Sequence, residues 1–435
     1  MRRTLVMGAA LIAVLVLPGT AAGHVTLSGA SPATQSTVRA PPTEIRLRFN
    51  QPVTVTSRAI QVLAPDGTVL SGNAKTEDGG HVVFARVSRL LKGSAYTVRW
   101  RVVGQDGHSP SGVYTFGVGV SPPPPTEAVG ARATTWKDDL ARWLLFSALG
   151  LVIGPLAVRL LVLRGPVPDP LERRFHLVTT FAAFSVINVG IAAFVLRASN
   201  ALQLPLADLV YGDLQPFAEK TRFGVAFLVM TVGFGIVATL LLLAWVSDRT
   251  APLWWALGLS VVFASGLSLS GHQATEPNAT WASELADWVH LVAASVWVGG
   301  LVTLAFLVWP AAPTLRRRAF LGFSRLAMGL VGALVLAGAY LAIVRLPQLD
   351  DLWSTDYGRT LLVKLAIVSL ALTWGGFHHL IVRPRLEAGA EPRVRPSLVG
   401  ETAVALTVLL AAAVLTNVAP PPPKPGSTSA SRSGR

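Results

Sequence analysis

Residues 222–246 read RFGVAFLVMTVGFGIVATLLLLAWV, and this stretch decides the fold class of the chain. A helix needs about 20 apolar residues to cross the hydrocarbon core of a bilayer. The whole chain of 435 residues is 51% hydrophobic and only 14% charged, which is far from the composition of a soluble domain. Similar stretches predict about eight spans in all, at 139–163, 175–197, 222–246, 253–271, 285–309, 320–345, 360–382 and 397–418.

The net charge of +14 comes largely from basic clusters that alternate along the chain. These clusters lie between spans one and two, five and six, and seven and eight, which makes those loops cytoplasmic by the positive-inside bias. An even number of spans then predicts that both termini lie outside the cytoplasmic membrane of a bacterium. The distribution indicates a partner in the lipid bilayer and no nucleic acid.

The first 23 residues have the pattern of a secretory signal peptide. Met1-Arg2-Arg3 is charged, Leu5 to Leu17 is apolar, and small residues precede position 24. Cleavage there makes His24 the N-terminus, whose α-amino nitrogen and imidazole Nδ1 can clamp one metal ion together. Such nitrogen ligation suits Cu(II). The alternative is a different cleavage position, which leaves His24 an ordinary histidine.

Residues 24–119 predict a small all-β domain outside the membrane. Residues 45–49 and 96–102 alternate with period two, and turn signals separate the strands. The length fits a sandwich of about seven strands. A Pro-rich linker at 120–134 leads into a membrane domain at 135–419, and a disordered external tail follows at 420–435. The predicted fold is thus an all-β sandwich followed by an all-α polytopic membrane bundle.

A loop near the end of the β domain contains a second group of candidate ligands. Asp106 and His108 stand two positions apart in the turn Gln105-Asp106-Gly107-His108-Ser109-Pro110. Together with His24 they offer a terminal amine, two imidazoles and a carboxylate, which are hard or borderline ligands. An Asp-Gly turn with a surface histidine is the ordinary alternative.

The β domain resembles the periplasmic copper-binding CopC family. The resemblance rests on His24, Ser31-Pro32-Ala33, Phe49-Asn50-Gln51-Pro52, Trp100-Arg101-Val102-Val103, and Asp106 to Pro110 followed by Gly112 and Phe116. It implies that His24, Asp106 and His108 bind Cu(II). His81 follows a Gly-Gly turn and is predicted to be an exposed strand histidine.

Soft ligands for Cu(I) are scarce. The chain has no cysteine, and only Met230 and Met328 remain once the signal peptide is removed. A pathway of thiolates or clustered methionines cannot be built from this sequence.

The outer ends of spans four and five contain the best polar set in the membrane domain. Ser265, Ser268 and His272 share one helical face, and Asp287 and His290 share another. A short loop joins the two spans, so His272, Asp287 and His290 are predicted to converge as a membrane relay. The alternative is that they are interfacial residues and the N-cap region of span five.

These residues also carry a resemblance to the CopD family of copper-resistance membrane proteins. The similar positions are Ser270-Gly271-His272, Asp287-x-x-His290, Trp297-x-Gly299-Gly300, Phe323-Ser324, Tyr357-Gly358-Arg359 and Lys364. The similarity extends over about 135–419. It implies a copper-handling membrane domain, to which the short linker would tether the outer copper site.

The inner ends of the spans contain three more histidines. His378, His379 and His176 could form an exit site, but nearby arginines favour ordinary interfacial histidines. Glu401 and Asn417 are candidates for polar lining.

These features together predict a copper-binding membrane protein that captures Cu(II) outside the membrane and passes copper into or across it, with import favoured. Other copper-resistance proteins are possible partners, and no enzyme activity is predicted. Two alternatives stay open: a copper oxidoreductase built on the terminal histidine, and a transmembrane haem protein using His176 with His378 or His379. The chain has no Walker-type motif, which disfavours ATP hydrolysis.

Overall fold

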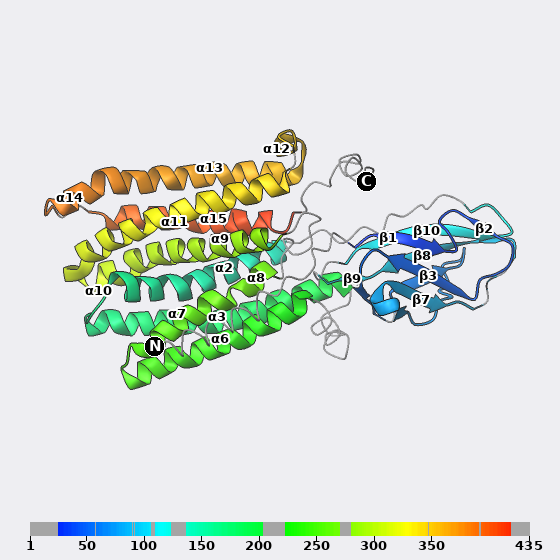
Figure 1. Cartoon of the computed structure of the whole chain (residues 1–435), viewed down its shortest axis with the longest axis horizontal. Helices are drawn as coiled ribbons and strands as arrows, with labels where there is room; N and C mark the ends of the chain where they lie inside the picture. Colours follow the sequence, from blue (N-terminus) through cyan, green and yellow to red (C-terminus); the bar gives the residue numbers. More distant parts are fainter. Residues whose placement is uncertain are drawn as a thin grey trace, which may run out of the picture.

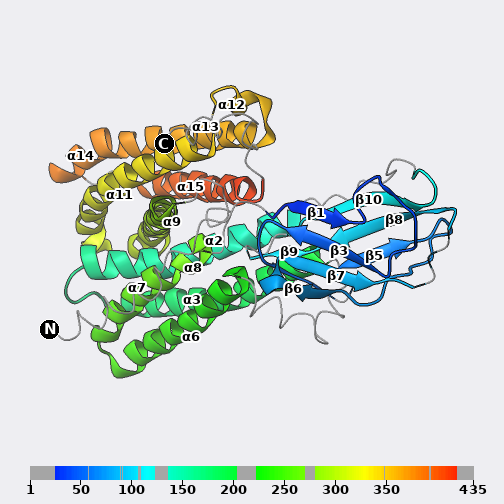
Figure 2. The ribbon, with the colours of Figure 1, turned by 45° about the vertical axis from the view of Figure 1, so that its right-hand side comes forward.

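The computed structural model describes residues 25–56, 58–88, 90, 92–105, 109–122, 136–202, 222–269, 280–346, 348–390 and 393–418. These residues form a β domain and a bundle of long helices, which lie end to end in Figure 1. The β domain adjoins the end of the bundle at which α2 begins, and the turned view in Figure 2 agrees.

The β domain consists of two four-stranded sheets and a short two-stranded ribbon. One sheet has the order β1 (Leu27–Ser31), β3 (Glu44–Phe49), β7 (Val82–Arg86), β6 (Lys75–Glu77), and its pairs are antiparallel. The other has the order β2 (Thr37–Val38), β10 (Ser111–Val118), β8 (Ser94–Arg101), β5 (Ile60–Leu63), with β2 and β10 parallel. The ribbon pairs β4 (Val53–Thr54) with β9 (Val103–Gly104). The predicted sandwich is confirmed.

Alternating residues of the central strands form the core of the sandwich. Ile45, Leu47 and Phe49 of β3 are buried, while Arg46 and Arg48 between them are not. Phe49 meets the edge of Trp100 at 5.3 Å between ring centroids. Gly112 lies opposite Trp100, and a Cβ there would stand 2.6 Å from the indole ring, so this position has no room for a side chain.

The structure contains eight helical segments that are long and apolar enough to cross a membrane, within the residues it describes. The predicted number of spans is confirmed. Three of them continue into a π-helical turn, which has i to i+5 hydrogen bonds. In chain order the elements are α2 (Trp136–Ala157) with η2 (Val158–Val162), α3 (Asp169–Leu202), α6 (Arg222–Ser247), α7 (Ala251–Phe263) with α8 (Ser265–Leu269), α9 (Trp281–Val302) with η5 (Thr303–Val308), α11 (Arg316–Arg345), α13 (Asp356–Phe377) with η7 (His378–Val382) and α14 (Arg383–Glu387), and α15 (Arg395–Leu415).

Helices α2 and α9 form the centre of the bundle. They are the two most deeply buried spans, and they pack against each other. Figures 1 and 2 show α3, α6 and α7 on one side of this pair and α11, α13 and α15 on the other. Polar side chains on any of these helices are therefore placed by helix packing and not by loops.

Candidate functional site

The three predicted copper ligands of the β domain, His24, Asp106 and His108, lie outside the described residues. The residues beside them are described, and they are held at one end of the sandwich. Thr26 donates its backbone N–H to Asn50 Oδ1 at 2.7 Å, which fixes the chain just after His24 to the end of β3.

The loop that carries Asp106 and His108 leaves the same end. Its first strand, β9, pairs with β4, so that Gly104 faces Val53, only three positions after Asn50. At the other side of the loop, Val102 donates its backbone N–H to the Pro110 carbonyl at 3.1 Å. The flanks of all three predicted ligands thus converge on the segment between β3 and β4. Gln51 in that segment is buried, and its Nε2 has no hydrogen-bond partner.

His81 does not have the environment predicted for it. It is half-buried in the turn before β7, and its Nδ1 lies 3.4 Å from the Phe49 carbonyl oxygen. The prediction of an exposed strand histidine was wrong because the Asp78–Gly80 turn directs the chain back over the end of β3. Among the described residues no group of three or more His, Asp and Glu side chains could hold a metal ion.

At one end of the membrane bundle, the predicted relay is described in part. His272 lies outside the described residues, whereas Asp287 and His290 are on α9. The N-cap of α9 is Thr280, whose side chain accepts from the Ser283 N–H. Asp287 and His290 therefore lie well inside the helix, and the interpretation of this pair as an N-cap region was wrong.

His290 packs on α11 with an unused ring nitrogen. A Cβ added at Gly338 would stand 3.1 Å from His290 Cε1, so this glycine makes room for the ring. His290 Nδ1 is buried and has no hydrogen-bond partner. Ser268 Oγ on α8 is also buried and has no hydrogen-bond partner. Buried polar atoms without a partner are costly in a membrane, and so they indicate a function.

Asp287 lies among cations. It interacts electrostatically with Arg142 of α2 and with Lys364 of α13. Lys364 in turn interacts electrostatically with Arg345 of α11. Asn417, predicted as a lining residue, instead donates to Asp139 Oδ1 at 2.6 Å and ties the end of α15 to the start of α2. A cation that approaches Asp287 meets positive charge as well as a carboxylate.

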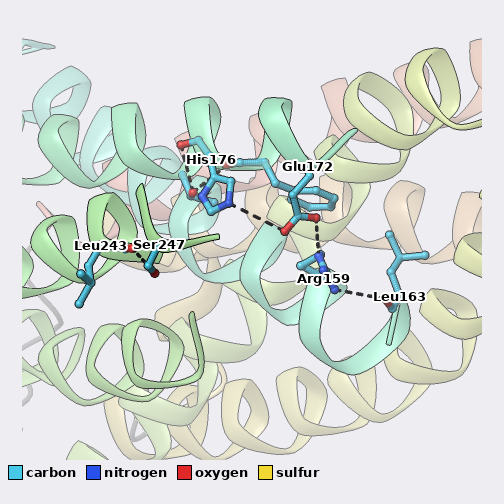
Figure 3. A network of polar contacts seen from close by, with 8 residues as sticks. Arg159, Leu163, Glu172, His176, Leu243 and Ser247 are labelled. Atoms are coloured by element: carbon cyan, nitrogen blue, oxygen red, sulfur yellow. Dashed lines mark hydrogen bonds and ion pairs between the residues drawn. The ribbon is translucent and has the colours of Figure 1, made fainter. Parts of the chain in front are cut away.

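The opposite end of the bundle contains a partly buried ion pair in its first half, drawn in Figure 3. Arg159 Nε donates to Glu172 Oε2 at 2.8 Å, and His176 Nε2 lies 3.9 Å from Glu172 Oε1. His176 also stacks on Trp245, with ring centroids 6.0 Å apart. His176 is therefore buried between α3 and α6.

A second buried cluster lies at the same end, between α13 and α15. His378 Nδ1 lies 2.7 Å from Glu401 Oε2, and its Nε2 lies 2.7 Å from Ser397 Oγ. Trp374 Nε1 donates to the same Ser397 hydroxyl at 3.0 Å. His378 and Glu401 are 6% and 3% exposed, so both side chains are buried inside the bundle. Neighbouring His379 is half-buried, 3.4 Å from Ser324 Oγ.

Sequence reasoning missed the pairing of His378 with Glu401 because the two residues belong to different helices. The signal that could have found it is the presence of two ionisable residues at matching depth in spans seven and eight. Both ring nitrogens of His378 thus lie 2.7 Å from polar atoms of α15.

Family models match three consecutive parts of the chain. They are the CopC domain at residues 27–119, the N-terminal domain of copper resistance protein D-like proteins at 134–281, and copper resistance protein D at 317–415. Copper transport protein CutJ of Bacillus subtilis (strain 168) is 28% identical over 453 residues, which cover 95% of this chain and 77% of that protein.

Two solved structures are similar to part of the chain. CopC from Methylosinus trichosporium OB3b is 30% identical and covers 24% of this chain and 99% of its own, with a TM-score of 0.20. PcoC, a methionine-rich copper resistance protein from Escherichia coli, is 25% identical and covers 22% and 99%, with a TM-score of 0.20. Neither extends over the membrane bundle.

Proposed function

The chain joins a CopC domain to a CopD membrane domain, and from this premise we propose that it captures Cu(II) outside the cytoplasmic membrane and passes copper inward. The observation that carries the proposal is the convergence at one end of the β sandwich. Asn50 holds the chain after His24, and β4 holds the strand before Asp106 and His108. The terminal amine, two imidazoles and one carboxylate then supply the nitrogen-rich ligand set that Cu(II) prefers.

The terminal amine makes capture dependent on cleavage and on pH. An amine must lose its proton before it can bind a metal ion, so the affinity for Cu(II) falls as the pH drops below the pKa of that amine. One extra residue before His24 removes the free amine from the site. We expect the purified mature protein to lose most of its Cu(II) affinity after this addition, measured by competition with a chelator.

The two internal ligands are tested against a matched histidine. His108→Ala removes an imidazole and should weaken Cu(II) binding strongly, whereas Asp106→Ala should have a smaller effect if the carboxylate is a distant axial ligand. His81→Ala is the control, because His81 lies at the same end of the sandwich but contacts the Phe49 carbonyl. Equal losses for His81→Ala and His108→Ala would contradict the ligand assignment.

The membrane relay is proposed at His272, Asp287 and His290. His290 is supported by its buried Nδ1, which has no hydrogen-bond partner among the described residues. His290→Ala should abolish copper accumulation by cells while Cu(II) binding by the β domain is unchanged, since the two sites belong to separate folding units. Retained accumulation in a folded His272/His290 double variant would overturn the relay.

The direction of movement is tested by cellular copper content. Cells that express the protein should contain more copper than cells without it, because the proposed capture site is outside. Lower copper content in expressing cells would indicate efflux instead. The oxidoreductase alternative is tested separately, by reductant-dependent peroxide production from the copper-loaded protein, which we expect to be absent.

A further inference from the structure

The two halves of the membrane domain repeat each other at a fixed spacing of 145 positions. Trp281 stands 145 positions after Trp136, and both begin a central helix. The same spacing relates Trp143 to Trp288 and Gly154 to Gly299. It continues without a gap into the next span, where buried Phe175 corresponds to buried Phe320.

Two hydrogen bonds between the halves are related by the same spacing of 145 positions. Trp143 Nε1 donates to the Leu406 carbonyl at 3.0 Å, and Trp288 Nε1 donates to the Val261 carbonyl at 2.8 Å. Val261 and Leu406 are also 145 positions apart. The first helix of each half thus binds the last helix of the other half through equivalent atoms. A reciprocal exchange of this kind is the mark of a two-fold relation, here between two parts of one chain.

The geometry at the centre agrees with a pseudo-two-fold axis between α2 and α9. Their π-helical turns begin at Val158 and Thr303, which are again equivalent positions. A Cβ at Gly154 would stand 2.4 Å from Gly299 Cα, and one at Gly299 would stand 1.9 Å from the Gly150 carbonyl oxygen. Backbone meets backbone at these glycines, so there is no room for an ion between α2 and α9 at this level. A path for an ion past this level must run inside one half.

The first half pairs its half-buried carboxylate with an arginine. Glu172 accepts from Arg159, whose guanidinium has only donors and cannot bind a metal ion. A metal cation at Glu172 would have to displace this permanent cation. The equivalents of His290 and Glu401 in this half are Leu145 and Ala256, and both are buried. The first half therefore has apolar side chains at these two positions, and its buried histidine, His176, stands beside a carboxylate that is already paired with Arg159.

At both of its ends, the second half has histidine side chains that can bind a metal ion. Among the described residues, Glu401 lies within ion-pair distance of His378, whose imidazole is a common metal ligand. Glu401 Oε2 lies close to His378 Nδ1 but outside hydrogen-bond geometry, so its lone pairs are unsatisfied. At the other end, His290 presents its free Nδ1.

We propose that, inward of the outer relay, the ion path runs from His290 through the second half, and that His378 and Glu401 form an inner station where copper is held by an imidazole nitrogen, a carboxylate oxygen and the Ser397 hydroxyl. The first half then serves as the scaffold that completes the bundle. Two strong ligands hold an ion less tightly than a closed site of three or four, which suits a station that must release its ion. This inference rests on the proposed copper transport.

The test is copper accumulation by cells that express the full chain. Glu401→Gln keeps the shape of the side chain and a neutral oxygen beside His378 but removes the carboxylate ligand. We expect accumulation to fall to the level of cells without the protein, at equal amounts of folded protein in the membrane and with unchanged Cu(II) binding by the β domain. Glu401→Ala copies Ala256 of the first half and should behave in the same way.

The control is Thr402→Val at the next position of α15. Thr402 is also buried, and its hydroxyl donates to the Leu398 carbonyl of its own helix at 2.7 Å. This variant should accumulate copper like the unaltered protein. If the unaltered protein itself accumulates no copper, the proposed function fails. If it accumulates copper and Glu401→Gln does so equally, the inner station is overturned and the proposed function stands.

Discussion

The two halves of the membrane domain share a scaffold but bury different charges. In the first half Arg159 neutralises Glu172, and in the second half His378 faces Glu401. The first pair contains a guanidinium, which has no lone pair for a metal ion, so we expect its loss to lower stability. The second pair contains an imidazole, which can bind a metal ion, so we expect its loss to lower transport. The comparison teaches that a buried carboxylate indicates function only once its partner is known.

The largest expected effect is at the seam that both halves need. Gly299→Leu would place a side chain where a Cβ already stands 1.9 Å from the Gly150 carbonyl oxygen. We expect no folded membrane domain, because two rigid backbones would have to separate. The measurement is the yield of monodisperse protein in detergent. Gly235→Leu on α6 is the matched control, since nothing lies within 4 Å of a Cβ there.

The next prediction distinguishes the roles of the two paired carboxylates, Glu172 and Glu401. Glu172→Gln leaves the Arg159 guanidinium buried without a counter-charge, and removing one partner of a buried pair costs about 3–5 kcal/mol. We expect a marked fall in the unfolding temperature but unchanged copper accumulation per folded molecule. Glu401→Gln should give the opposite result, with accumulation lost and stability little changed.

A double variant checks the cause of that instability. Arg159→Leu copies Leu304, the equivalent residue of the second half, and combined with Glu172→Gln it leaves no unpaired charge. The double variant should regain most of the lost stability. If the double variant is as unstable as Glu172→Gln alone, the unpaired charge of Arg159 is not the cause of the lost stability.

Most of the architecture could be predicted from the sequence, because the periodicities of the two domains differ so clearly. Alternation in residues 45–49 marks β3, and stretches such as 222–246 mark spans. The site residues in the bundle were harder to predict. His176 and His378 stand near arginines in the sequence, yet helix packing buries both. Their partners Trp245 and Glu401 are on other helices, so no local pattern reports them.

The repeat of 145 positions was present in the sequence and was overlooked. Its clearest marks are the tryptophan pairs Trp136 and Trp143, then Trp281 and Trp288. Few other identities accompany them, since apolar residues exchange freely on lipid-facing surfaces. The reciprocal hydrogen bonds make the repeat evident, because they tie the similarity to equivalent atoms.

A smaller effect tests whether Asp287 is a ligand or a counter-charge. Arg142 and Asp287 occupy equivalent positions of the two halves and interact electrostatically. Exchanging them, as Arg142→Asp with Asp287→Arg, should recover most of the stability lost by either single change, a coupling of about 1–2 kcal/mol. The measurements are thermal unfolding in detergent and copper accumulation.

The two readouts of this exchange have different meanings. If stability and accumulation both recover, Asp287 is a counter-charge, and the relay consists of His272 and His290 alone. If stability recovers and accumulation does not, the carboxylate at position 287 is itself needed as a ligand. Failure of stability to recover would contradict the equivalence of the two positions.

The smallest expected effect is the most direct test of the pseudo-two-fold relation. Trp143→Phe and Trp288→Phe each remove one hydrogen bond to a carbonyl of the opposite half while keeping an aromatic ring in place. Hydrogen bonds between membrane helices are worth about 0.6 kcal/mol on average, so each variant should lower stability by about that amount. Because the two bonds are equivalent, the two losses should be equal, and they should add in the double variant if the bonds act independently. Equilibrium unfolding of the purified protein measures all three. A large loss of stability for one tryptophan variant and none for the other would mean that the two hydrogen bonds are not energetically equivalent. The two-fold relation would then hold for the sequence but not for the interface.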